Sequence, residues 1–186
     1  MLRHAHMAGP FSRPDDYDRI TTRHLRGMDA RIVADVTAAG LGPDDRVLDA
    51  GTGPGRVPRA LATAQPHLRI DGVDLDPQMI EYAREHTAAD RVAFTVGDVA
   101  HLPFPDETFT LIVSSISQHH WTDVEGAIKD LRRVLRPGGQ LWIYDMRFVL
   151  GRARAAARAG FRSVRTEPVR TSRLPIRLIA RLSVQA

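Results

Sequence analysis

The chain has 186 residues, no cysteine and a formal net charge of +4, with 43% hydrophobic and 26% charged residues. This composition is typical of one soluble globular domain, and the lack of cysteine excludes disulfides, thiolate metal sites and a cysteine nucleophile. No apolar run approaches the roughly 20 residues of a membrane helix, and the N-terminus has no apolar signal core, so we expect a cytoplasmic protein without a membrane partner.

The N-terminal region is predicted to be a flexible segment followed by two helices. Residues 1–14 mix His, Gly, Pro and Ser and are expected to be flexible. Residues 15–42 are expected to hold the leading helices, because acidic residues come first and Ile32, Val33 and Val36 have helical spacing. Glycines then end the second helix.

A glycine-rich turn follows the first predicted strand. Residues 47–50 are apolar enough for a buried strand, and Gly51, Gly53 and Gly55 come directly after it. Pro58 then lies in the first turn of a helix, where its missing N–H is not needed. Glycines let a ligand approach the backbone, and a helix N-terminus offers unpaired N–H groups, so the pattern predicts a site for a nucleotide-like ligand. A simple strand-to-helix turn is the alternative.

The second predicted strand, residues 68–74, ends in an acidic residue. Asp74 lies 23 residues beyond Gly51, where an acid of a doubly wound sheet can accept hydrogen bonds from both ribose hydroxyls. Capping of the next helix is its alternative role. Asp76 directly precedes Pro77 and is the better N-cap, which leaves Asp74 for the ligand.

The next two predicted strands also end in polar residues. Residues 91–96 form a strand followed by Asp98, and residues 110–114 form an apolar strand typical of the centre of a parallel sheet. His119 and His120 come a few residues after that fourth strand. Because parallel strands end at one edge of the sheet, all these side chains are expected along that edge.

The C-terminal part is predicted to be a helix, a strand and a basic unit. Residues 124–135 form a helix that Arg-Pro-Gly-Gly ends, and a fifth strand follows at 140–145. Another helix is expected at 151–159, with candidate strands at 161–165 and 176–184. Residues 147–186 hold ten arginines and one acid, but the whole chain has only one lysine and uses arginine throughout. A solvated surface is therefore favoured over an anionic partner such as RNA, which stays open.

Several of these segments resemble the class I S-adenosylmethionine-dependent methyltransferases, of the small single-domain type 11/25 group. The resemblance rests on Asp-x-Gly-x-Gly-x-Gly from Asp49, on the acids Asp74 and Asp98, and on Arg-Val-Leu-Arg-Pro-Gly-Gly before the fifth strand. One departure is Thr110, where the family usually has Asp.

The resemblance implies the fold, an α/β Rossmann-like doubly wound sheet of seven strands with helices on both faces. The sheet would be mostly parallel, with an antiparallel last strand between the fifth and the sixth. A single domain would fill residues 15–186, with the cofactor-binding core at 43–146 and a basic helix and hairpin at 147–186.

The resemblance also implies S-adenosylmethionine as the cofactor. Asp74 would bind the ribose, Leu75 would pack on the adenine, Asp98 would face the adenine amino group, and the N–H of Val99 would face a ring nitrogen. The full set of implied cofactor residues is Tyr17, Asp49, Ala50, Gly51, Thr52, Gly53, Gly55, Asp74, Leu75, Asp98, Val99 and Ser114.

The catalytic and substrate residues are predicted from their place at the active-site edge. His119 or His120 is the candidate general base, with packing beside Trp121 as the alternative for one of them. Asp145 is expected to orient the substrate and Arg147 to hold an acidic group. No metal site is expected.

The leading hypothesis is methyl transfer to an oxygen, nitrogen or carbon nucleophile of a small-molecule acceptor. Methylation through cysteine thiolates, as for arsenite, is excluded. The alternatives are a methyltransferase that acts on RNA or protein through the basic C-terminal region and a non-catalytic S-adenosylmethionine-binding module. A nicotinamide dehydrogenase is disfavoured by the glycine spacing. The site would be covered by the N-terminal 30 residues, by a second subunit in a homodimer, or left open for a macromolecule.

Overall fold

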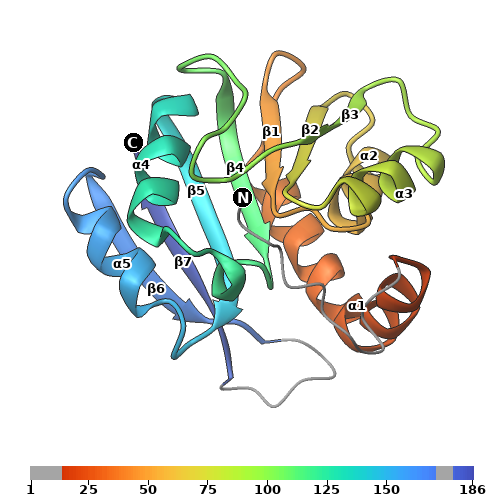
Figure 1. Cartoon of the computed structure of the whole chain (residues 1–186). Coiled ribbons are helices and arrows are strands. Elements are labelled where there is room, and N and C mark those ends of the chain that lie inside the picture. The colour runs from red at the N-terminus through yellow and green to blue at the C-terminus, as the bar shows by residue number, and fades with distance from the viewer. Residues whose placement is uncertain (1–13, 171–177) are drawn as a thin grey trace, which may run out of the picture.

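The computed structural model describes residues 14–170 and 178–186, which form one twisted sheet with helices on both faces (Figure 1). The strands are β1 Arg46–Ala50, β2 Arg69–Asp74, β3 Val92–Val96, β4 Phe109–Ser115, β5 Leu135–Met146, β6 Ser163–Pro168 and β7 Ile179–Gln185. The helices are α1 Pro14–Ala38, α2 Arg56–Ala64, α3 Pro77–Glu85, the short 3-10 helix η1 Gln118–His120, α4 Val124–Val134 and α5 Gly151–Arg158. The flexible segment predicted for residues 1–14 lies, except for Pro14, outside the described residues.

The seven-stranded sheet has the predicted topology. Its strand order is β3-β2-β1-β4-β5-β7-β6, and β1 pairs in parallel with both β2 and β4. β7 runs antiparallel between β5 and β6, as expected. The order reverses at β1 and β4, and the crevice outside the carboxyl ends of strands at such a point is where open α/β sheets bind ligands.

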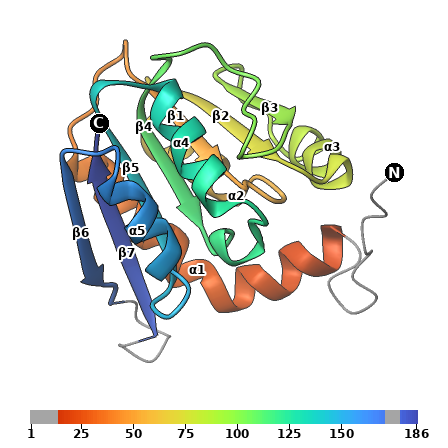
Figure 2. The same ribbon diagram turned by 60° about the vertical axis from the view of Figure 1, so that its left-hand side comes forward.

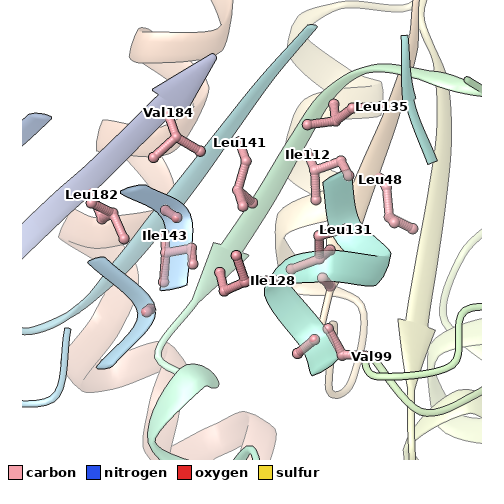
Figure 3. Close-up of a cluster of buried hydrophobic side chains, with 14 of the residues drawn as sticks. Leu48, Val99, Ile112, Ile128, Leu131, Leu135, Leu141, Ile143, Leu182 and Val184 are labelled. Carbon is pink, nitrogen blue, oxygen red and sulfur yellow. The ribbon is translucent and has the colours of Figure 1, made fainter. Parts of the chain in front are cut away.

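Alternate residues of the central strands face two separate cores. Leu141 and Ile143 of β5 pack with α4 and α5, whereas Trp142 and Tyr144 pack with α1 and α2. Figure 3 shows the first core, where side chains from α4 meet those of β1, β4, β5 and β7. The central strands are therefore covered on both sides, which explains their nearly continuous apolar sequences.

The N-terminal helix differs from the prediction, because α1 is one continuous helix of 25 residues instead of two (Figure 2). Gly27 does not interrupt it. Met28, Ile32 and Val36, spaced four apart, are all at most 1% exposed and pack on the sheet. Burial of this stripe outweighs the roughly 1 kcal/mol by which glycine disfavours a helix.

The C-terminal strands also differ in their limits. β5 already begins at Leu135, which was predicted as the last residue of the preceding helix, and it includes the segment 136–139 predicted as a tight turn. Its pairing with β4 nevertheless jumps from Leu135 to Gln140, and Gly138 has a φ of 79°. The predicted sixth strand at 161–165 lies at Ser163–Pro168. The predicted start of the seventh, Ile176, lies outside the described residues.

Within residues 14–170 and 178–186, no helix combines the length and the apolar character that crossing a membrane requires.

Candidate active site

The glycine turn lies between the end of β1 and the start of α2. Gly51, Gly53 and Gly55 have φ values of 74°, 54° and 78°, in the left-handed region that side chains disfavour. A Cβ on Gly51 would lie 1.8 Å from the Oγ of Ser117, because the turn after β4 packs directly on this loop. The backbone N–H groups of Gly51 and Thr52 donate to the carbonyl of Val73, so the loop is anchored to β2.

Asp49 and Ala50 form the buried base of this loop. Asp49 is 1% exposed, and one of its carboxylate oxygens accepts a hydrogen bond of 2.7 Å from the hydroxyl of Thr52. Burial raises the pKa of Asp49 to about 7, with smaller contributions from the nearby carboxylates of Asp29 and Asp74, while Thr52 and Arg56 act in the opposite direction.

Asp74 connects the loop to the start of α3. Its carboxylate accepts the N–H of Gly53 at 2.7 Å and the N–H of Asp76 at 3.0 Å. Burial raises the pKa of Asp74, and these two N–H donors oppose the shift. The predicted capping role of Asp76 is confirmed, because its side chain accepts from the N–H of Gln78. Asp74 is thus bonded to the backbone but keeps acceptor lone pairs for a ligand.

Apolar and acidic side chains follow at the ends of β2 and β3. Leu75 is 53% exposed and Val96 is 44% exposed, both unusual for large apolar residues. Asp98 is half-exposed, and its carboxylate accepts the N–H of Ala100. The side chain of Val99 belongs to the core.

A sharp turn follows β4. Ser114 is fully buried, and its hydroxyl has no hydrogen-bond partner among the described residues. Ile116 has a φ of 50°, which is rare for a β-branched residue, and its N–H donates to the carbonyl of Tyr144 in β5. This turn places Ser117 against the glycine loop and directs η1 toward the end of β5.

His119 and Asp145 meet at that point. Asp145 is 0% exposed, and its two oxygens lie 3.2 and 3.1 Å from the Nδ1 of His119. The backbone N–H of His119 donates to the same carboxylate at 3.2 Å, and the N–H of Met146 donates at 2.8 Å. The ring of His120 lies 4.0 Å from that of His119, and burial followed by the neighbouring His119 lowers the pKa of His120.

For Arg147 and Tyr17, the two remaining predicted residues, the described part of the structure gives no side-chain contact with the site. Arg147 is exposed just after β5, and its N–H donates to the carbonyl of Leu178. Tyr17 lies in α1, and its side chain is outside the described part of the structure.

Three residues at the site were not predicted. Ser117 packs on Gly51, Arg56 is the first residue of α2, and Asp29 of α1 lies 3.5 Å from the guanidinium of Arg56. The position of Arg56, directly after the third glycine of the loop, could have identified it from sequence as a residue of the site. Nothing local in the sequence connects Asp29 to it.

A small cavity opens beside the glycine loop. It is lined by Asp49, Gly51, Thr52, Gly53, Pro54, Arg56, Val57 and Ser115. Buried atoms of Asp49, Arg56 and Ser115 have no hydrogen-bond partner among the described residues. Such atoms are costly unless a ligand or water pairs with them, so the cavity has the features of a binding site.

Comparisons with known proteins agree with this geometry. A family model described as a methyltransferase domain matches residues 48–143, just over half of the chain. The chain belongs to the S-adenosylmethionine-dependent methyltransferases. Of this methyltransferase's curated relatives, an arsenite methyltransferase of Halobacterium salinarum is 36% identical over 58% of the chain and 29% of its own length. A 27-O-demethylrifamycin SV methyltransferase of Amycolatopsis mediterranei is 35% identical over 56% of the chain and 40% of its own length.

The fold of this methyltransferase is similar over the whole chain to that of a Haloferax volcanii methyltransferase solved in complex with the activator Trm112. The TM-score is 0.76 at 20% identity, and the match covers 100% of this chain and 99% of the other. The chain thus spans less than half of the two curated relatives described above, but nearly the full length of this structural neighbour.

The residues of this methyltransferase fit the family's cofactor, S-adenosylmethionine. Gly51 and Gly53 line the cavity without side chains, so a ligand can approach the backbone there. The unpartnered atoms of Asp49 and Ser115 suit a polar part of that ligand. Leu75 and Val96 offer apolar surface for a base near the ends of β2 and β3.

Proposed function

We propose that this protein transfers a methyl group from S-adenosylmethionine to a small-molecule acceptor, and that the acceptor atom is an oxygen that loses a proton. The observation that carries the proposal is the His119–Asp145 contact at the edge of the sheet that also holds the glycine loop. Nitrogen and carbon acceptors are the alternatives, and they need a base only where the attacking atom must be deprotonated.

When bound, the cofactor supplies a methyl group already activated on a sulfonium, so the protein has to align and deprotonate the acceptor. The Asp145 carboxylate accepts from Nδ1–H of His119, which leaves the lone pair on Nε2. His119 then acts as general base through Nε2, and Asp145 is a positioning residue. Because the pKa of His120 is lowered, its ring stays neutral and does not repel a proton arriving on His119.

The cofactor would be held by the residues that surround the loop and the ends of β2 and β3. We assign the ribose to Asp74 and the adenine to Leu75, Asp98 and the N–H of Val99. The exposed apolar side chains and the remaining acceptor lone pairs of Asp74 support this assignment.

A small-molecule acceptor is supported by the named relatives, one of which acts on a rifamycin. Arsenite is not favoured for this chain, although a relative is named for it, because the chain has no cysteine. Methylation of RNA or protein is the second candidate, favoured by the exposed arginines of α5 and the turn after it, which are Arg154, Arg158 and Arg162.

The test is turnover with labelled S-adenosylmethionine against a panel of phenols, alcohols, amines and carbon acids. On the best acceptor, His119→Gln should lower kcat by about 10²- to 10⁴-fold and leave the Kd of S-adenosylhomocysteine unchanged. His86→Gln, at the exposed end of α3, is the matched control. Unchanged kcat in His119→Gln would contradict the base, and turnover confined to RNA or protein would favour the second candidate.

The cover of the acceptor side is also a proposal. We infer a homodimer in which a second copy covers the acceptor side of the site, next to the carboxyl end of β5, where Phe148 is 78% exposed. Light scattering on the purified protein distinguishes a dimer from a monomer, with and without cofactor.

A further inference from the structure

The guanidinium of Arg133, on α4, uses all of its donors on nearby oxygens. It donates to the backbone carbonyls of Phe104 at 2.8 Å and of Leu102 at 3.0 Å, both in the loop that joins β3 to β4. It also donates to the carboxylate of Asp130 at 2.7 and 3.0 Å and to that of Asp106 at 2.8 Å. These bonds engage every N–H group that a guanidinium carries. Such an arginine fixes the loop more firmly than one that forms a single surface ion pair.

Asp130 holds the same loop from α4. Its carboxylate accepts the N–H of Leu102 at 2.6 Å. Burial by itself would raise the pKa of Asp130, but the hydrogen bonds from Arg133 and Leu102 lower it overall, so the group is ionised at neutral pH. Both polar backbone groups of Leu102 are therefore bound by side chains of one helix. Asp106 is 73% exposed, and its pair with Arg133 contributes little.

Leu102 ends a compact turn that starts at Asp98. The N–H of Ala100 donates to the carboxylate of Asp98, and the N–H of His101 donates to the carbonyl of Asp98, both at 2.9 Å. Val99 and Leu102 are at most 7% exposed and pack in the first core, which α4 covers. A shift of Leu102 would therefore move the whole turn, including the Asp98 carboxylate and the Val99 N–H.

In the proposed function, two groups of this turn face the adenine. The carboxylate of Asp98 accepts from the amino group, and the N–H of Val99 donates to a ring nitrogen. A 6-oxopurine offers a carbonyl oxygen and a ring N–H at the same places, so both contacts become repulsive. Discrimination requires both protein groups to lie within about 3 Å of the base at once. It therefore depends on the position of the turn.

We propose that Arg133 is a positioning residue for recognition of the adenine. Its guanidinium, with Asp130, holds the turn at the place where Asp98 and Val99 read the 6-amino group, so it acts through the loop. The inference rests on the assignment of the adenine to Asp98 and Val99 in the proposed function. Its signature is a change in base selectivity, whereas a purely structural role would change only stability or weaken all ligands alike.

The experiment is calorimetric titration of the full chain with S-adenosylhomocysteine and S-inosylhomocysteine. These ligands differ only at the 6-position of the purine and in the proton on the adjacent ring nitrogen, and the weaker one is measured by displacement. The parent protein should prefer S-adenosylhomocysteine by about 100-fold, because the oxo ligand leaves polar groups of the protein unpaired. Arg133→Gln should weaken S-adenosylhomocysteine about tenfold and S-inosylhomocysteine less than about twofold, so the preference should fall.

Arg132→Gln is the matched control. Arg132 directly precedes Arg133 on α4 and also donates to a backbone carbonyl, but to that of Gly160, which follows α5. Its replacement should leave the preference unchanged. Arg133→Lys keeps a positive charge beside Asp130 but lacks the planar fork, so the preference should fall by a smaller factor, about threefold. This variant keeps the test decisive if Arg133→Gln does not fold, and thermal unfolding checks the folding of each variant.

Equal weakening of both ligands by Arg133→Gln, or an unchanged preference in Arg133→Gln and Arg133→Lys, would overturn the proposal. Asp98→Asn separates this failure from a failure of the proposed function. It should lower the preference at least as much as Arg133→Gln, because the asparagine amide can donate to the oxo group. An unchanged preference in Asp98→Asn would contradict the adenine assignment itself, and the inference with it.

Discussion

In the half of the sheet formed by β1, β2 and β3, an acid lies near the carboxyl end of every strand, namely Asp49, Asp74 and Asp98. In the half formed by β5, β7 and β6, β5 alone ends with a buried acid, Asp145, and exposed arginines follow. In the proposed function, the first half binds the cofactor, a ligand of fixed chemistry, so short local patterns encode it. The second half would face the acceptor, and its chemistry would depend on one contact between residues 26 apart in sequence.

The largest expected effect comes from Gly51→Ala, which should break the half that holds the cofactor. The left-handed φ and the clash with Ser117 together should lower the free energy of unfolding by about 2–5 kcal/mol and abolish binding of S-adenosylhomocysteine. Urea denaturation and calorimetry measure both. Gly138→Ala shares the left-handed φ but has open space, so it should cost only about 1–2 kcal/mol and leave binding intact.

Next in size is Asp145→Asn, which addresses the acceptor half alone. Loss of the carboxylate frees the tautomer of His119, and kcat should fall by about 10²- to 10⁴-fold. Steady-state kinetics measure the effect on turnover, and the Kd of S-adenosylhomocysteine measures the effect on cofactor binding. The Kd should not change. The double variant His119→Gln/Asp145→Asn should be no slower than the worse single variant. Additive losses would show that the two residues act independently.

A smaller effect is expected for Asp74→Ala, which sharpens the roles within the cofactor half. Loss of acceptors for the ribose should weaken S-adenosylhomocysteine by about 1–3 kcal/mol. Its neighbour Asp76→Ala removes the cap of α3 and should lower the free energy of unfolding by about 1 kcal/mol without changing the Kd. Equal Kd values for the two variants would make Asp74 a turn residue only.

The smallest effect is expected from replacing Arg154 and Arg158 of α5 by Gln. Both side chains are exposed, so the free energy of unfolding should change by less than about 0.5 kcal/mol and turnover of a small acceptor should not change. Filter binding of RNA at rising salt checks the second candidate function. Strong, salt-sensitive binding that this variant loses would assign an RNA to this half.

The prediction from sequence succeeded where a local rule decides the structure. The positions of β1, β2 and β4, the cap at Asp76 and the insertion of β7 all agree with it. It missed the continuity of α1, because burial against the sheet outweighs Gly27. It also missed the contacts of Asp145 with His119 and of Arg56 with Asp29, because both depend on how distant elements pack and leave no periodic signal in the chain.

The bend at Ile116 has a consequence for local stability. A β-branched residue with a φ of 50° stores strain of roughly 1–3 kcal/mol. That energy is recovered when the turn relaxes, so residues 116–120 should open at a lower free energy than β4, which they follow. Amide hydrogen exchange in this turn should accordingly be faster than in the strand. Binding of the cofactor beside Ser117 should slow the exchange in the turn. The segment that carries His119, the proposed base, would then be the first part of this edge of the sheet to unfold transiently.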